Sequence, residues 1–309
     1  AVYFPENSDE IVSLIKEANK KKLTVTAAGN RTGLTGACIP QNGIVIATDK
    51  LNKIIEINQK QFYAIVEPAV LLADFQKELK LQNLFYPPDP TETNCYLGGT
   101  VATNASGAKT FKYGPTRNYV IGLQVVLPDG EVIDIERDNQ KANGYELILS
   151  AQTGKSIYLQ IPDYTFPSVK NASGYFVKKD MDAIDLFIGS EGTLGIITKI
   201  KFRLLPQPEN TISCVLFFED ETNALNFLEE AREASYKNKL KSINDNVNAL
   251  ALEFFDERAL KFLAKDFSAI PDNAQAAIWF EQESTSDSFD SILETWNVLM
   301  QTHNVNEET

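Results

Sequence analysis

Residue types that many catalytic and metal sites depend on are scarce in this chain. Its 309 residues contain one histidine, His303, and three cysteines, Cys38, Cys95 and Cys214. The cysteines are widely spaced and odd in number, and no two form a Cys-x-x-Cys pair. This argues against a disulfide framework and against a zinc or iron–sulfur site within the chain. A Ser-His-Asp or Cys-His catalytic arrangement would depend on His303 alone, which we interpret as a surface residue of a polar tail.

Long hydrophobic runs and excess positive charge are also missing. No apolar run reaches the roughly 18–20 residues that a membrane-spanning helix needs. The net charge is −13, and the one lysine block, at residues 20–22, ends an expected helix, where the helix dipole favours positive charge. Such a surface would repel a phosphate backbone. We therefore expect no nucleic acid partner, no transmembrane segment and a cytoplasmic location.

The length of the chain is that of two domains rather than one. The chain begins with Ala1, and no charged-then-apolar leader follows it. We expect a piece of a longer polypeptide, with a domain boundary near residues 206–209, where the sequence pattern changes.

Before that boundary, short β-branched strands alternate with helices. Asn7 or Ser8 is the expected N-cap of a helix with apolar residues at helical spacing, and a second helix is expected at residues 71–83. Pro128-Asp129-Gly130 between two apolar runs predicts a β-hairpin over residues 120–135. From residue 137 to 171 the pattern weakens, which indicates an inserted surface segment.

After the boundary, three rounds of strand and then helix follow each other. The expected strands are residues 211–220, 248–256 and 275–283, and each precedes a helical pattern. This alternation predicts an α+β fold with helices on one face of an antiparallel sheet.

The segment "AAGNRTGLTG", from Ala27 to Gly36, has two interpretations. Its glycines suit a loop with tight turns, because glycine adopts positive φ without steric cost. They also suit a phosphate-binding loop, in which successive backbone N–H groups approach an anion. A P-loop is excluded, since Ala37-Cys38 stands where Lys and Ser/Thr are needed, and the G-x-G-x-x-G spacing is not met. The segment alone leaves both interpretations open.

Three glycine-rich segments on one domain favour a shared cleft over independent turns. The segments "AAGNRTGLTGA", "PPDPTET", "LGGTVATNASG", "KYGPTRNYVIGLQVVLPDGEV" and "IGSEGTLGIITKIKFRLLPQP" resemble the FAD-linked 2-hydroxy-acid dehydrogenases and oxidases, in that family's order. This group lies within the vanillyl-alcohol-oxidase and p-cresol-methylhydroxylase (PCMH) superfamily. The resemblance implies an α+β chain with a PCMH-type FAD-binding domain of two α/β subdomains over residues 1–206. Part of a ferredoxin-like α+β substrate domain follows over residues 207–309.

The resemblance also implies which residues bind the cofactor. In the family, the first loop wraps the FAD pyrophosphate, the middle segments line the flavin and the last loop lies against the adenosine half. The matching positions are Gly29, Asn30, Arg31, Thr32 and Gly33; Pro88, Asp89, Gly98, Gly99, Thr103, Asn104, Gly107, Tyr113 and Gly114; and Glu191, Gly192, Gly195, Ile196 and Ile197.

Four of these side chains have a second interpretation. Arg31 either adds charge at the phosphates or faces solvent, and Asp89 either lines the flavin or caps a turn between prolines. Tyr113 either contacts the cofactor or packs. Glu191 either accepts from ribose hydroxyls or is a carboxylate of the turn.

The mode of attachment follows from what the first loop lacks. Members that bind FAD covalently use a histidine in or near this loop, or another His or Cys in the domain. The loop has no histidine, and Cys38 lies just past it in an expected strand approach. We therefore expect non-covalent FAD, with Cys38 packed. The missing histidine also disfavours a sugar oxidase of the same superfamily.

The expected function is oxidation of a D-2-hydroxy acid by hydride transfer to flavin. D-Lactate, glycolate and D-2-hydroxyglutarate are the substrate class that the resemblance implies. No residue here is a convincing base, since the family's catalytic histidines, metal ligands and C-terminal motif lie beyond residue 309. The alternative is a non-catalytic flavin-binding fragment. The electron acceptor stays open, and a homodimer and peripheral membrane association are compatible with the resemblance.

Overall fold

The N-terminal helix forms where its capping residue and apolar periodicity predict it. Helix α1 spans Ser8–Lys21, and the Asn7 side chain accepts a hydrogen bond from the Glu10 N–H, so Asn7 is confirmed as the N-cap. Its buried residues are Ile11, Ile15 and Ala18, one stripe of the helix.

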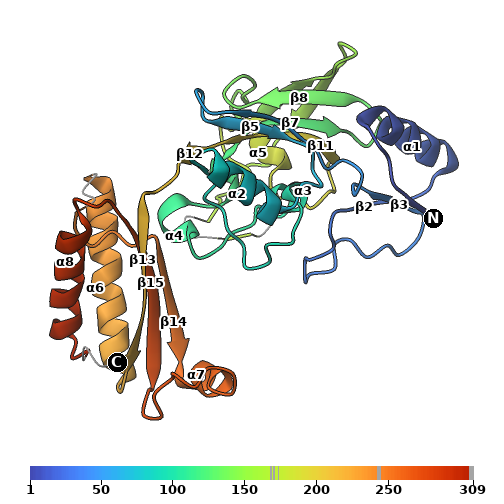
Figure 1. Cartoon of the computed structure of the whole chain (residues 1–309). Helices are drawn as coiled ribbons and strands as arrows, with labels where there is room; N and C mark the ends of the chain where they lie inside the picture. The colour runs from blue at the N-terminus through green and yellow to red at the C-terminus, as the bar shows by residue number, and fades with distance from the viewer. Residues whose placement is uncertain (168, 170, 173, 242–244, 306–309) are drawn as a thin grey trace. The chain divides into compact units, whose positions relative to one another are not determined.

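The computed structural model describes residues 1–167, 169, 171–172, 174–241 and 245–305. Two compact units are present (Figure 1). The first consists of residues 1–106 and 115–206, and the second of residues 107–114 and 207–309. The chain therefore leaves the first unit after Ser106 and returns to it at Pro115.

A small parallel sheet begins the first unit. Its strand order is β1-β3-β2, and both pairings are parallel. The strands are β1 (Val2–Tyr3), β2 (Val25–Ala28) and β3 (Ile44–Ala47). All four residues of β3 are buried, as in a strand covered on both faces. The first glycine-rich loop is the connection from β2 to β3.

An antiparallel sheet of order β4-β5-β11-β7-β8 forms the larger layer of this unit (Figure 1). Its strands are β4 (Ile54–Asn58), β5 (Tyr63–Val66), β7 (Val120–Val126), β8 (Val132–Glu136) and β11 (Ile196–Arg203). Strands β7 and β8 pair antiparallel, and the Gly130 N–H bonds the Leu127 carbonyl, which confirms the hairpin predicted from Pro128-Asp129-Gly130.

Short elements complete the first unit. They are α2 (Leu72–Leu81), β6 (Leu84–Phe85), α3 (Leu97–Ala102), the 3₁₀ turn η1 (Thr116–Asn118), α5 (Ile184–Phe187) and β12 (Leu205–Pro206). The predicted inserted surface segment, residues 137–171, contains an antiparallel hairpin, β9 (Glu146–Ser150) with β10 (Ser156–Gln160). In β9, Leu147 and Leu149 are buried while Ile148 is exposed, so the alternation is that of a strand with one covered face.

The second unit has an antiparallel sheet of order β13-β15-β14. Its elements follow one another as β13 (Asn210–Phe218), α6 (Glu221–Leu240), β14 (Ala251–Asp256), α7 (Glu257–Leu263), β15 (Ala276–Ser284) and α8 (Phe289–Thr302), with α4 (Thr110–Tyr113) from the earlier segment. The predicted rounds of strand and helix are confirmed. Phe227 of α6 and Trp296 of α8 pack with Phe280 of β15 in one core.

In the described ranges of the chain, no helix combines the length and the apolar character needed to cross a membrane.

Candidate functional site

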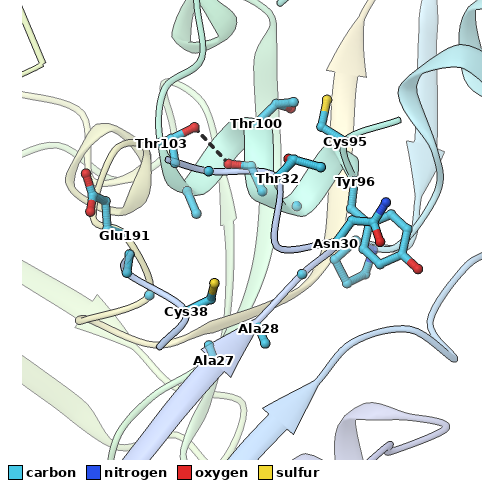
Figure 2. Close-up of a pocket in the computed structure, with 18 of the residues that line it drawn as sticks. Ala27, Ala28, Asn30, Thr32, Cys38, Cys95, Tyr96, Thr100, Thr103 and Glu191 are labelled. Atoms are coloured by element: carbon cyan, nitrogen blue, oxygen red, sulfur yellow. Dashed lines mark hydrogen bonds between the residues drawn. The ribbon is translucent and has the colours of Figure 1, made fainter. Parts of the chain in front are cut away.

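A cavity of about 290 Å³ opens in the first unit where three glycine-rich segments meet (Figure 2). The segments are the β2–β3 loop, the chain around α3, and the loop that precedes β11. Thirteen of the residues predicted to bind the cofactor line this cavity: Gly29, Asn30, Arg31, Thr32, Gly33, Gly98, Gly99, Thr103, Glu191, Gly192, Gly195, Ile196 and Ile197. Segments far apart in the sequence thus meet as the shared-cleft interpretation requires.

The β2–β3 loop offers a run of backbone donors. From Asn30 to Cys38, no backbone N–H donates a hydrogen bond to another residue in the described part of the chain. Arg31 adopts a left-handed backbone with φ of 61°, which costs an ordinary residue of order 1–2 kcal/mol. Backbone N–H groups that are aligned and not used by the fold are suited to binding an anion.

Two adjacent glycines of α3 have different reasons for being glycine. A Cβ on Gly98 would lie 2.5 Å from the Cβ of Pro68, so packing within the fold excludes a side chain there. A Cβ on Gly99 would meet no atom within 4 Å. Both residues line the cavity. Space left open at Gly99 is what a ligand lying close to the backbone needs.

The loop before β11 is tied to α3 by its backbone. The N–H of Gly189 donates to the carbonyl of Val101 at 3.0 Å, and the N–H of Glu191 donates to that of Ala102 at 2.8 Å. Glu191 and Gly192 both have left-handed backbones, with φ of 52° and 75°. These bonds fix one side of the cavity against α3.

Charged side chains contribute little net charge to the cavity. Arg31, Glu92 and Glu191 are its charged lining residues. A guanidinium nitrogen of Arg31 lies 3.3 Å from the carboxylate of Asp49, which partly neutralises the cation. A bound diphosphate would therefore be held chiefly by backbone N–H groups.

Sequence reasoning missed several lining residues, among them Cys38, Cys95, Tyr96, Thr100 and Ser190. They lie within five residues of predicted positions in the same segments, so closeness in the sequence was the available signal. Burial raises the pKa of the Cys95 thiol to about 11, which keeps it protonated near neutral pH. Burial also raises the pKa of Tyr96.

Cys38 differs in part from its expected setting. It lies in a turn of the loop and not in a strand approach. It packs against the buried residues Ala28, Val45 and Ala47 and also lines the cavity.

The interpretation of His303 as a surface residue is confirmed only in part, because the residue is half-buried. Its side chain is 13% exposed, and its Nε2 lies 2.8 Å from a carboxylate oxygen of Glu230. Its ring also packs edge-on against Phe227. His303 therefore serves the packing of the second unit, where α8 ends beside α6.

The remaining predicted residues lie outside this cavity lining, and the binding role of every predicted residue stays a prediction. They are Pro88, Asp89 and Asn104 in the first unit and Gly107, Tyr113 and Gly114 in the second. Asn104 accepts a hydrogen bond from the Arg117 N–H at 2.9 Å. The Tyr113 hydroxyl donates to a carboxylate oxygen of Glu283, and Lys112 pairs with the other at 2.6 Å.

The first unit therefore has a cavity lined by glycine-rich backbone, with main-chain N–H groups that are free to bind an anionic ligand. Comparison with known proteins agrees. A family described as "FAD binding domain" matches residues 1–136. The D-lactate dehydrogenase of Anaerostipes hadrus is 34% identical over 215 residues, which are 69% of this chain and 38% of that protein.

Two further relatives match over more of the chain. The D-2-hydroxyglutarate dehydrogenase of Stutzerimonas stutzeri (strain A1501) is 30% identical over 262 residues, 84% of this chain and 46% of that protein. Glycolate oxidase subunit GlcD of Bacillus subtilis (strain 168) is 29% identical over 298 residues, 95% of this chain and 53% of that protein. The chain spans about half the length of these curated relatives or less.

Solved structures support the fold alone. A structure of alkyldihydroxyacetonephosphate synthase matches with a TM-score of 0.68 at 17% sequence identity, covering 99% of this chain and 51% of that one.

The chain belongs to the FAD-linked 2-hydroxy-acid oxidoreductase family, and FAD is the cofactor of its flavin-binding domain. The residues present fit that cofactor. The backbone donors from Asn30 onward suit a diphosphate, and the space at Gly99 admits a ligand against the backbone.

Proposed function

We propose that this chain supplies the FAD site of an enzyme that oxidises a D-2-hydroxy acid. The observation that carries the proposal is the meeting of three glycine-rich segments around one cavity with donors that the fold does not use. FAD accepts a hydride when bound. The D-lactate, D-2-hydroxyglutarate and glycolate named for the relatives give the proposed substrate class.

Within this proposal, different segments of the chain bind different parts of FAD. The loop from Gly29 to Gly33 holds the diphosphate, because its N–H groups are not committed elsewhere. The backbone of Gly98 and Gly99 lies against the flavin, with Thr103 at its polar edge. Residues 191–197 hold the adenosine half.

We propose that the FAD is held without a covalent bond. None of the described residues that line the cavity is a histidine. Its buried cysteine, Cys95, has a raised pKa and is a poor nucleophile near neutral pH. Cys38 is engaged in packing with Ala28, Val45 and Ala47.

The second unit is proposed as the first part of a ferredoxin-like substrate domain. Its support is the alternation of strand and helix over β13, α6, β14, α7, β15 and α8, with antiparallel pairing throughout. A cytoplasmic location and a homodimer stay predictions from the sequence.

One experiment separates catalysis from flavin binding alone. The purified chain, loaded with FAD, is given D-lactate, glycolate or D-2-hydroxyglutarate together with an artificial electron acceptor. Turnover supports the enzyme proposal. Bound FAD without turnover of any of the three favours the alternative, a flavin-binding fragment that is incomplete on its own. That alternative draws support from the share of its relatives that the chain spans.

A further inference from the structure

An ion cluster of three residues lies beside the loop that precedes β11. The carboxylate of Asp185 pairs with Arg117 at 3.1 Å and with Arg137 at 3.0 Å. The three side chains are between 13% and 20% exposed. We call these residues the arginine cluster. None of them is among the predicted cofactor-binding positions.

Arg117 binds backbone as well as the carboxylate. Its guanidinium donates to the carbonyl of Asp185 at 2.6 Å and also to the carbonyl of Ile188. Its backbone N–H donates to Asn104, which directly follows α3 and its C-cap Thr103. Arg117 thus connects the end of α3 to α5 and to Ile188, the C-cap of α5.

The chain after α5 leads directly into one side of the cavity. Gly189 and Glu191 donate backbone hydrogen bonds to α3, and Ser190, Glu191 and Gly192 line the cavity. The left-handed backbone of Glu191 is strained and persists only if its surroundings hold it. The carbonyl that Arg117 binds at Ile188 is three residues before Glu191.

Two neighbouring side chains, those of Arg137 and Phe176, hold Arg117 in place. Arg137 donates from Nε to the carbonyl of Val120 at 2.9 Å and from a terminal nitrogen to the carbonyl of Arg117 at 3.2 Å. The centre of the Phe176 ring lies 4.3 Å from the guanidinium carbon of Arg117. Burial lowers the pKa of Arg117, and Asp185 opposes that shift, so the guanidinium stays charged.

We propose that Arg117, paired with Asp185 and supported by Arg137, is a positioning residue for the FAD site. It holds residues 189–192 in the conformation that lines the cavity, without itself contacting the cofactor. This inference rests on the proposed function, in which that cavity binds FAD.

The test compares FAD affinity and local backbone opening in matched variants. Arg117→Lys keeps the charge and the pairing with Asp185, but a single ammonium cannot reach both carbonyls. If the cavity-lining conformation of residues 189–192 falls to about one tenth to one hundredth of the molecules, the Kd for FAD weakens about 10- to 100-fold. Arg117→Met, which also loses the charge, is expected to bind FAD more weakly than Arg117→Lys. Arg232→Lys, at an exposed helix position, is the matched control and leaves the Kd unchanged.

Hydrogen exchange provides the second readout. The amides of Gly189 and Glu191 are expected to exchange faster in Arg117→Lys than in the unsubstituted chain, while those of β7 and β11 keep their rates. Unchanged Kd and unchanged exchange at Gly189 and Glu191 would overturn the proposal. A uniform rise in exchange across the first unit would overturn it too, because it would mean a general structural role.

The outcomes stay distinct in two less favourable cases. If Arg117→Met does not fold, Arg117→Lys still decides the question. If the unsubstituted chain does not bind FAD, the proposed function fails. The exchange rates of Gly189 and Glu191 in Arg117→Lys then decide the positioning role separately: faster exchange supports it and unchanged exchange refutes it.

Discussion

The adjacent glycines of α3 provide a sharp prediction, because substitution by alanine should lower stability at one position and weaken FAD binding at the other. In Gly98→Ala the new methyl would meet the Cβ of Pro68 at 2.5 Å and its backbone at 3.1 Å. Overpacking of this kind costs about 1–3 kcal/mol. For a unit of this size each kcal/mol lowers Tm by roughly 2–4 °C.

Gly99→Ala should leave the fold intact. Its methyl meets nothing within 4 Å, and alanine is favoured over glycine in a helix by roughly 0.5–1 kcal/mol. The methyl enters the space proposed for FAD, so we expect the Kd for FAD to rise about tenfold or more, equivalent to ~1.4 kcal/mol.

Both effects are measured on the same samples, by thermal unfolding of the FAD-free protein and by fluorescence titration with FAD. Gly99→Ala that binds FAD as the unsubstituted chain does would refute the assignment of this space to the cofactor. Gly98→Ala with an unchanged Tm would refute the packing argument.

Three further predictions concern charge and burial. The pKa of Cys95 is raised from 9.0 to about 11 in the folded chain, so its contribution to stability is fully present below pH 9 and is lost as pH rises towards 11. Cys95→Ala should therefore show a shallower fall in Tm between pH 8 and pH 10.5 than the unsubstituted chain. An identical fall in both proteins would contradict this cause. Asp49→Asn should release Arg31 from its ion pair and tighten FAD binding several-fold at low salt, and this gain should shrink as salt is added. Arg31→Gly should weaken FAD binding. Equal affinities for FAD in the two variants would show that Arg31 does not contribute to the site. Glu283→Gln breaks the part-buried ion pair with Lys112 and weakens the hydrogen bond from Tyr113. It should lower the free energy of unfolding, measured in urea, by about 1–3 kcal/mol. The control Glu257→Gln breaks an exposed pair with Lys261 and should lower it by less than about 0.5 kcal/mol.

Local patterns predicted much of the fold. The Asn7 cap, the hairpin around Pro128-Asp129-Gly130 and the strand–helix rounds after residue 208 each depend on neighbours in the sequence, and each is confirmed. The β9–β10 hairpin was missed although Leu147 and Leu149 alternate with polar or exposed neighbours. Exposed Ile148 and Tyr158 hide that alternation, because an apolar residue on the open face removes the contrast between the two faces.

Features that depend on distant contacts could not be predicted in this way. The grouping of residues 107–114 with the second unit depends on contacts such as Tyr113 with Glu283, 170 residues apart in sequence. The arginine cluster likewise joins residues up to 68 positions apart. No sequence motif with a fixed spacing indicates either the grouping of residues 107–114 or the arginine cluster, because only the folded sheets bring the partner residues together.

The most direct test of the flavin site is hydrogen exchange of the chain with and without FAD. Without FAD, the amides from Asn30 to Gly36 should exchange rapidly, since none of them donates a hydrogen bond to another described residue. With FAD they should become protected, together with residues 98–103 and 190–196, while β13 to β15 stay unchanged. FAD binding that leaves residues 30–36 unprotected, or that protects a different region instead, would contradict the account.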